Sequence, residues 1–259
     1  MSLELFRQSL ADLPLGRTAY LETIGSTNDV ALEWGRQGAP DLSLVYAEEQ
    51  TAGRGRGNRK WFSRPGAALT FSLLLRPTEI EHLSLGRFSI VGALAVCAAL
   101  EDIGLSPQIK WPNDVLVEGR KVCGILVESL WQGEKPDCIV IGIGLNVTAQ
   151  SVPPDNEVLF PASSLEQVGI VSIERHSLLR SILEHFIRWR KLLHTVHFLQ
   201  EAERRLAFRN QWVAITSHTT LLYEGKVDGL QPNGGLRLTT REGKQIEVDY
   251  GEIHLRPLL

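Results

Sequence analysis

Short runs of aliphatic and β-branched residues, separated by turn residues, recur through the first half of the chain and predict β-strands. A turn that contains Gly119 supplies the backbone freedom of a tight hairpin between two of these strands. Glycines in the last strand leave open space beside its backbone. The predicted strands are Ser43–Ala47, Ala68–Leu75, Gln108–Trp111, Val115–Val117, Lys121–Glu128 and Cys138–Val147.

Three segments have the apolar pattern of helices. Residues Ser26–Asp29 are of the types that cap helix N-termini, and apolar positions within Val30–Trp34 follow directly. This order predicts a short amphipathic helix that ends near Gly35–Gly38. The segment Leu85–Ile103 is apolar on nearly all sides, so we expect a helix packed against a sheet face. An apolar stripe along Ser177–Arg209 predicts one or two long helices.

The C-terminal part of the chain has only β-type patterns, with Gly-containing turns between them, and this spacing predicts a small β-barrel. Its expected strands are Trp212–Ile215, Thr220–Tyr223, Lys226–Leu230, Leu236–Thr239 and Gln245–Val248. The pattern therefore predicts an α+β fold with a mixed sheet flanked by helices over residues 1–209, followed by a separate barrel over residues 210–259.

The composition of the chain excludes several classes of protein. The chain has 27 Lys and Arg against 30 Asp and Glu, a net charge of −3, so any basic binding site must be local. Cys97, Cys123 and Cys138 lack the spacing of a zinc site or a disulfide framework, which favours a reducing cytoplasm. No targeting segment is recognisable, and the most apolar stretch, Phe88–Leu100, is too short to span a membrane.

The loop Gln50–Trp61 is dense in Gly and Arg. Glycines let a backbone approach a ligand, and arginines donate forked hydrogen bonds to phosphate or carboxylate, so the loop is typical of an anion site. A solvated flexible loop and a single-stranded nucleic-acid site are the alternatives. Neither a Walker loop nor a dinucleotide fingerprint is present. Trp61 either stacks on a base or packs in the core.

Two further segments carry polar residues between strands. The first segment is Lys110–Asp114. The second contains Lys121, which stands shortly before Gly124. Taken alone, each of these lysines is an ordinary surface charge. The glycines of Ile141–Asn146 either line a pocket or allow close sheet packing. His194 and His197 are three residues apart, but no further ligands accompany them, so we assign no metal ligand.

Taken together, these segments resemble the biotin protein ligases, whose motifs all occur here in the family's order. The closing residues Gly251–Arg256 also look like the end of that family's C-terminal barrel. The resemblance implies a catalytic domain like that of class II aminoacyl-tRNA synthetases and an SH3-like barrel. The matching segments are Ser26–Asn28, Gly53–Arg56 followed by Trp61, Lys110–Asp114, Lys121 before Gly124–Glu128, and Gly142–Asn146.

The resemblance also implies roles for individual residues. The implied biotin-binding residues are Ser26, Thr27, Asn28, Gln50, Gly53, Arg54, Gly55, Arg56, Lys121, Gly124, Gly142 and Gly144. The implied ATP-binding residues are Arg56, Arg59, Trp61, Asn113, Lys121 and Asn146. The expected catalytic residues are Lys121, Arg54, Arg56 and Asp114, of which Asp114 is our candidate for assisting proton removal from the acceptor lysine.

The implied activity is formation of biotinyl-AMP from biotin and ATP, with Mg²⁺ on the phosphates, and transfer of biotin to a lysine of the biotin carboxyl carrier protein of acetyl-CoA carboxylase. Positioning and electrostatics carry most reactions of this kind. Only 25 residues precede Ser26, too few for a helix-turn-helix domain, so we expect no DNA binding. A homodimer is compatible with an exposed sheet edge, which the sequence alone does not locate.

Two other functions compete with this one. A lipoate protein ligase or octanoyltransferase has a similar catalytic fold but a different arginine- and glycine-rich signature, which is absent here. An RNA-binding module would use the Gly-Arg loop and the barrel, but it leaves Lys110–Asp114 and Gly124–Glu128 unexplained. Within the loop, Gly57-Asn58 stands where some biotin ligases have further Arg or Gly.

Overall fold

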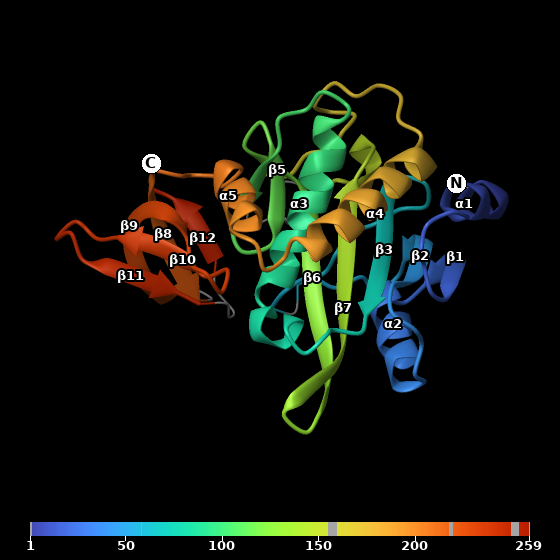
Figure 1. Cartoon of the computed structure of the whole chain (residues 1–259). Coiled ribbons are helices and arrows are strands. Elements are labelled where there is room, and N and C mark those ends of the chain that lie inside the picture. Colours follow the sequence, from blue (N-terminus) through green and yellow to red (C-terminus); the bar gives the residue numbers. More distant parts are fainter. Residues whose placement is uncertain (1, 58, 155–159, 218–219, 250–253, 259) are drawn as a thin grey trace.

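The computed structural model describes residues 2–57, 59–154, 160–217, 220–249 and 254–258 (Figure 1). Asn58 and the first half of the closing segment Gly251–Arg256 lie outside them. A seven-stranded sheet forms the larger domain, in the order β1-β2-β3-β7-β6-β5-β4, with β1 and β2 parallel and the other pairs antiparallel. Its strands are β1 (Thr18–Ile24), β2 (Ser43–Gln50), β3 (Ala68–Leu75), β4 (Gln108–Lys110), β5 (Asp114–Val117), β6 (Arg120–Gln132) and β7 (Lys135–Asn146).

The helices of this domain cover the two faces of the sheet unequally. On one face α3 packs with α4, and α2 lies on the other face, against β2, β3, β6 and β7 (Figure 1). The α-helices are α1 (Leu3–Leu10), α2 (Thr27–Arg36), α3 (Arg87–Glu101), α4 (Arg175–Lys191) and α5 (Val196–Arg204), and short 3₁₀ turns occupy Glu81–Ser84 and Ala149–Ser151.

Alternation of side chains along the central strands explains why there are two apolar layers. Successive residues of a strand point to opposite faces. On β3, for example, Leu73 belongs to the large core under α3 and α4, whereas Leu74 belongs to a small cluster under α2 with Ala31 and Trp34. Because α2 is only 10 residues long, it covers part of its face and leaves the rest of that face for other groups.

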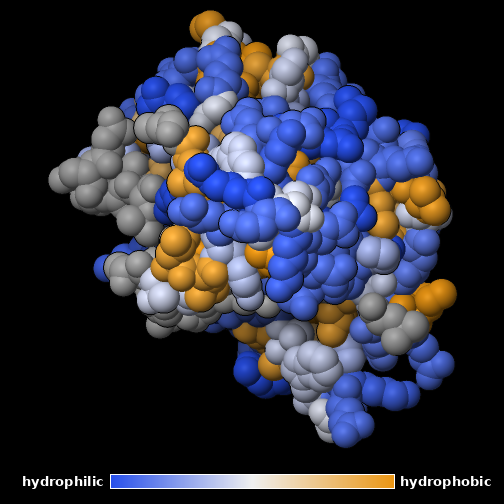
Figure 2. Space-filling model, turned by 90° about the vertical axis from the view of Figure 1, so that its left-hand side faces the viewer, coloured by the Kyte–Doolittle hydropathy of each residue, from blue (hydrophilic) through white to orange (hydrophobic). Residues whose placement is uncertain are grey.

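A second, five-stranded antiparallel sheet follows, in the order β11-β10-β9-β8-β12, and it confirms the predicted C-terminal barrel. It lies beside α5, apart from most of the larger domain (Figure 1). On the side of the molecule where the barrel lies, the surface is mostly hydrophilic, and apolar residues form separate patches (Figure 2). The strands are β8 (Trp212–Ser217), β9 (Thr220–Leu230), β10 (Leu236–Thr239), β11 (Gln245–Val248) and β12 (His254–Pro257).

Most predicted elements of the larger domain are confirmed within a few residues, including the hairpin turn, where Glu118 and Gly119 both have positive φ. Three differences are corrections. The structure adds α1 and β1, neither of which the sequence pattern predicted. The two strands expected at Thr220–Tyr223 and Lys226–Leu230 are a single strand, β9. The helices α4 and α5 agree with the one or two long helices predicted for Ser177–Arg209.

Among the described residues, none of the helices combines the length and apolar character needed to cross a membrane. The second sheet begins at Trp212, close to the predicted boundary between residues 209 and 210.

Candidate active site

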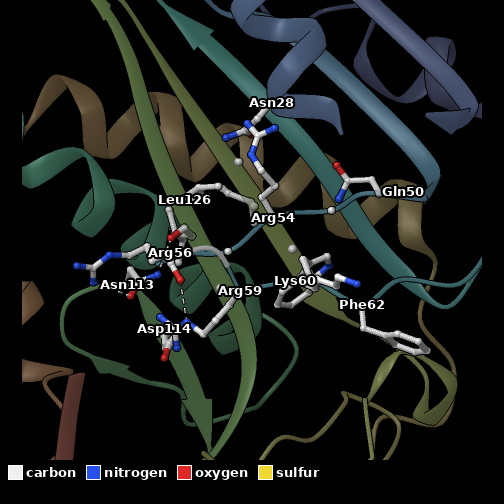
Figure 3. A pocket seen from close by; sticks show the side chains of 18 of the residues that line it. Asn28, Gln50, Arg54, Arg56, Arg59, Lys60, Phe62, Asn113, Asp114 and Leu126 are labelled. Atoms are coloured by element: carbon white, nitrogen blue, oxygen red, sulfur yellow. Dashed lines mark hydrogen bonds between the residues drawn. The ribbon is translucent and has the colours of Figure 1, made fainter. Parts of the chain in front are cut away.

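A pocket with a volume of about 1680 Å³ opens on the sheet face that α2 covers only in part. All seventeen residues that the sequence singled out for binding or catalysis line it, although they come from α2, the Gly-Arg loop and four strands. Figure 3 shows Arg54 extending towards Asn28 and Arg56 lying beside Asn113. The structure therefore brings the candidate residues together, while their individual roles stay predictions.

Glycines form the floor of the pocket, where neighbouring strands align them. Gly144 on β7 pairs with Gly124 on β6, and Gly142 pairs with Ser72 on β3. A Cβ atom at Gly144 would overlap the indole of Trp61, and one at Gly142 would overlap the amide of Asn28. These glycines thus let side chains of the protein lie directly on the sheet, and both glycines also line the pocket.

A buried network of neutral polar groups lies at one end of the floor. Both the backbone N–H and the hydroxyl of Thr27 donate to Gln50 Oε1, at 2.7 and 2.9 Å. The hydroxyl of Ser72 lies 2.7 Å from Thr27 Oγ1 and 2.6 Å from Asn28 Oδ1. Ser26 caps α2 in an extended conformation without a side-chain hydrogen bond to the helix. Ser72 is fully buried, and sequence reasoning missed it because a serine within an apolar strand carries no motif.

Arg54 stands at the mouth of the pocket and is already paired with carboxylates. Its guanidinium donates to Glu128 at 2.8 Å and forms a short contact with Asp29. The hydrogen bond that Arg54 donates to Asp29, together with the Glu128 carboxylate, raises the pKa of Arg54. Asn28 Nδ2 also donates to Glu128, at 2.6 Å. Arg54 thus joins α2 to β6, and Arg56, which donates to Asn113 Oδ1 at 3.2 Å, lies deeper along the loop.

Two lysines share one carboxylate in the floor. Lys121 Nζ lies 2.6 Å from Asp114 Oδ1, and Lys110 Nζ lies 3.1 Å from Asp114 Oδ2. The reading of Lys110 as a surface charge is wrong, because only 5% of its side chain is exposed. Burial lowers the pKa of Lys110, and Asp114 partly opposes that shift. Burial alone would raise the pKa of Asp114, but Lys121 and then Lys110 hold it well below its usual range.

The pocket is cationic although the chain is acidic. Among the described residues that line it, seven are Lys or Arg and three are Asp or Glu, an excess of four positive charges. One of the cations is Arg256, which comes from β12 of the barrel, and another is Arg59, which donates to the carbonyl of Arg56 at 2.8 Å. Sequence reasoning missed Arg256 as a site residue, because only folding brings the barrel against the pocket of the catalytic domain. This charge favours the anion site over a merely solvated loop.

Two buried polar atoms in the pocket have no hydrogen-bond partner among the described residues, namely Trp61 Nε1 and Asn146 Oδ1. The amide nitrogen of Asn146 donates to the carbonyl of Ser163 at 3.0 Å, which fixes the side chain with its oxygen unsatisfied. Buried polar atoms usually find a partner, so these two are candidates for contact with a ligand.

Nothing in the described parts of the chain groups three or more metal-ligand side chains. Both oxygens of Asp114 are engaged by lysines, so the pocket offers no dedicated cation cage, and a Mg²⁺ ion would fit here only as a companion of bound phosphates. His194 and His197 are exposed, as expected, although His194 lies between α4 and α5. Cys97, Cys123 and Cys138 are buried free thiols.

The fold and the site together define a class of protein: a two-domain α+β protein whose glycine-floored pocket places a neutral polar network beside a cationic cluster. Comparison with known sequences narrows this class. The model of the biotin/lipoate A/B protein ligase family matches residues 20–146. The bifunctional ligase/repressor BirA of Bacillus spizizenii is 35% identical over 229 residues, 86% of this chain and 70% of that protein.

This chain covers nearly the whole length of two further relatives. The biotin–acetyl-CoA-carboxylase ligase of Paracoccus denitrificans is 33% identical over 250 residues, 87% of this chain and 97% of that protein. The structure of the biotin protein ligase of Aquifex aeolicus in complex with biotin and ATP superposes with a TM-score of 0.79 at 31% identity, covering 93% of this chain and 99% of that one. The chain belongs to the biotin/lipoate A/B protein ligase family, as its motifs predicted.

Proposed function

We propose that this protein is an ATP-dependent biotin protein ligase, which forms biotinyl-5′-AMP and transfers the biotin to a lysine of a biotin carboxyl carrier protein. The observation that carries this proposal is the arrangement over the glycine floor, with the neutral hydrogen-bonding network beside Gly142 and Lys121 beside Gly124. The pocket as a whole has an excess of cations, of which Arg54 shares Glu128 with Asn28. The relatives with biotin ligase names and the Aquifex complex with biotin and ATP support it.

The polar network suits the ureido ring of biotin. That ring has two N–H donors and one carbonyl acceptor, and Gln50, Thr27, Ser72 and Asn28 provide buried groups of both kinds. Lipoate carries a dithiolane ring without such donors or a carbonyl acceptor, so it would form no hydrogen bonds with this network. The network therefore favours biotin over lipoate as the substrate.

The cations of the pocket suit the adenylation step. A biotin carboxylate oxygen attacks the α-phosphorus of ATP, a new C–O–P linkage forms, and pyrophosphate leaves. Both reactants are anions that repel each other, so fixed cations lower the barrier by bringing them together. We assign this work to Arg56 and Lys121, with Arg54 supporting the loop through Glu128 and Asp29. Trp61 and Asn146 have the unsatisfied atoms that would meet the adenine.

In the transfer step the acceptor lysine, as a neutral amine, attacks the acyl carbon of biotinyl-AMP and AMP leaves. The hypothesis that Asp114 accepts the amine's proton is disfavoured, because a carboxylate whose pKa lies below its usual range is a weak base. We propose instead that Asp114 holds Lys121 in place and that the proton leaves to solvent. Neutral amine is then supplied by the ordinary titration of the acceptor lysine.

Several finer features belong to the same proposal. The acceptor is the carrier protein of acetyl-CoA carboxylase or a similar carboxylase, and Mg²⁺ enters with ATP. The enzyme works in the cytoplasm, where its three buried thiols stay reduced. Absence of DNA binding and the formation of a homodimer both stay predictions, as does the division at residues 209 and 210.

Transfer of labelled biotin to a purified carrier domain tests the function. With ATP and Mg²⁺ present, we expect labelling of the carrier and none of a carrier whose acceptor lysine is replaced by arginine, since only the lysine is a nucleophile. Labelled lipoate serves as the competing substrate. Transfer of lipoate but not biotin would make the lipoate ligase the correct assignment.

A further inference from the structure

The C-terminal barrel makes direct hydrogen bonds to the back of the motif that contains Lys110 and Asp114. Trp111 is 1% exposed, and its indole Nε1 donates to the carbonyl of Gly234 at 3.0 Å. Gly234 belongs to the turn Gln231–Gly235, which connects β9 and β10 of the barrel. A residue in the middle of the pocket motif is thus held by a carbonyl of the other domain.

A second contact fixes the same turn. Arg87, the first residue of α3, is 8% exposed. It donates from Nε to the carbonyl of Pro232 at 2.6 Å, and from Nη1 to the carbonyl of Leu193 after α4. The turn is internally rigid as well, because Gln231 N–H donates to the carbonyl of Gly235 at 2.8 Å. We call Arg87, Trp111 and the turn Gln231–Gly235 the interdomain brace.

The linker between the domains supports the same edge of the sheet. Ile109 on β4 accepts a hydrogen bond from Ala207 N–H at 2.9 Å and donates to the carbonyl of Arg205 at 2.7 Å. Both neighbours of Lys110 in the chain, Ile109 and Trp111, are therefore held by the C-terminal part of the molecule. The side chain of Lys110 is held on the other side by Asp114.

We infer that the interdomain brace positions the charged groups of the pocket floor, so that docking of the barrel sets the placement of Lys110, Asp114 and, through Asp114, Lys121. Arg87 and Trp111 act here as positioning residues, since both contact the barrel turn and act on the pocket's charges through the backbone of β4 and the turn that follows. The polar network that suits biotin lies on α2 and β3, away from the brace. Substitutions in the brace should therefore weaken the binding of ATP more than the binding of biotin. This expectation rests on the proposed function.

The test compares Arg87→Met, Trp111→Phe and the milder Arg87→Lys with two matched controls, Arg188→Met on the exposed face of α4 and Trp131→Phe, whose side chain is 54% exposed. Hydrogen exchange of the 259-residue chain is the first readout and needs no activity. In the brace variants we expect amides of residues 109–117 to exchange about fivefold faster, with wild-type rates in the controls. Faster exchange confined to residues 231–236 and the start of α3 would overturn the inference.

Steady-state pyrophosphate exchange is the second readout. Loss of the hydrogen bond from Trp111 in Trp111→Phe should raise the KM for ATP by about fivefold, while the KM for biotin stays near the wild-type value. A merely structural brace would lower the amount of active enzyme without this split, and equal changes in both KM values contradict the inference. Arg87→Lys, which keeps one charged donor, should recover part of the ATP effect. If the wild-type protein shows no biotin-dependent exchange, the proposed function fails, and the hydrogen-exchange readout still decides the brace.

Discussion

At the scale of single residues, the main feature is one carboxylate shared by two lysines. Two ammonium groups so close together repel each other, and Asp114 compensates for this with a hydrogen bond to each. Lys110 is almost completely buried, whereas 24% of the Lys121 side chain is exposed towards the pocket. Lys121 is therefore the member of the group that can reach a substrate, and Asp114 keeps it there.

Lys121→Ala tests this assignment. Removing a preorganised positive group from the position where charge develops should lower the rate of adenylate formation by about a hundredfold or more. The fold should survive, since Lys110 remains to pair with Asp114. Single-turnover formation of biotinyl-AMP measures the effect, and Lys135→Ala, at a side chain that is 71% exposed, is the control. Wild-type rates in Lys121→Ala would remove this lysine from the chemistry.

Residue types and their order were enough to predict the candidate site, because five short segments carry most of it. Sequence alone missed Ser72, Glu128 as the partner of Arg54, and Arg256. Ser72 belongs to no local pattern. Glu128 and Arg256 lie in matched segments, but only strand register and the docking of the barrel bring them to Arg54 and into the pocket. The burial of Lys110 was likewise invisible, because only the fold supplies the carboxylate that makes a buried ammonium tolerable.

At the scale of elements, strand alternation placed the pocket and the core on opposite faces of one sheet. The core face is closed by α3 and α4, and a partly buried ion pair attaches α4 to the strands beneath it. Arg175 donates to Glu48 at 2.7 Å and to the hydroxyl of Tyr46 at 2.9 Å. Burial opposes ionisation of Glu48, but the hydrogen bond from Arg175 lowers its pKa overall.

Arg175→Met should destabilise the protein by about 2 kcal/mol, because the Glu48 carboxylate loses its charged partner and keeps the hydrogen bonds from the Tyr20 and Tyr46 hydroxyls. Urea unfolding at neutral pH measures the loss, with Arg188→Met as the exposed control. A carboxyl with a lowered pKa stabilises the fold above its unfolded pKa of about 4.3, and this contribution disappears as the pH falls. The difference between Arg175→Met and wild type should therefore shrink below that pH. Equal losses in the two variants would contradict a specific role of this ion pair.

Elements with strong apolar periodicity were predictable, and the two that were missed have weak patterns. The strand β1 lies at the sheet edge and has no fully buried residue, so its sequence lacks an apolar face. The helix α1 buries only Phe6 and Leu10. A division of β9 into two strands was expected because Glu224-Gly225 reads as a turn, but the structure continues β9 through it and packs Gly225 closely against Leu238.

At the scale of the whole molecule, the pocket depends on both domains. The catalytic domain supplies the glycine floor and the polar network, while the barrel contributes Arg256 and, through the interdomain brace, supports Trp111. A chain with a net charge of −3 thereby presents a pocket with a local excess of positive charge. Such a pocket should attract ATP specifically rather than polyanions in general, because the rest of the acidic surface repels long nucleic acids.

Biotin-dependent exchange of labelled pyrophosphate into ATP tests the central claim most directly, since it needs no carrier protein and follows the adenylation step itself. The 259-residue chain with Mg²⁺ should catalyse exchange when biotin is added and should not do so with lipoate in its place. Exchange with lipoate alone, or no exchange with biotin in a folded sample, would contradict the account of this pocket as the active site of a biotin protein ligase.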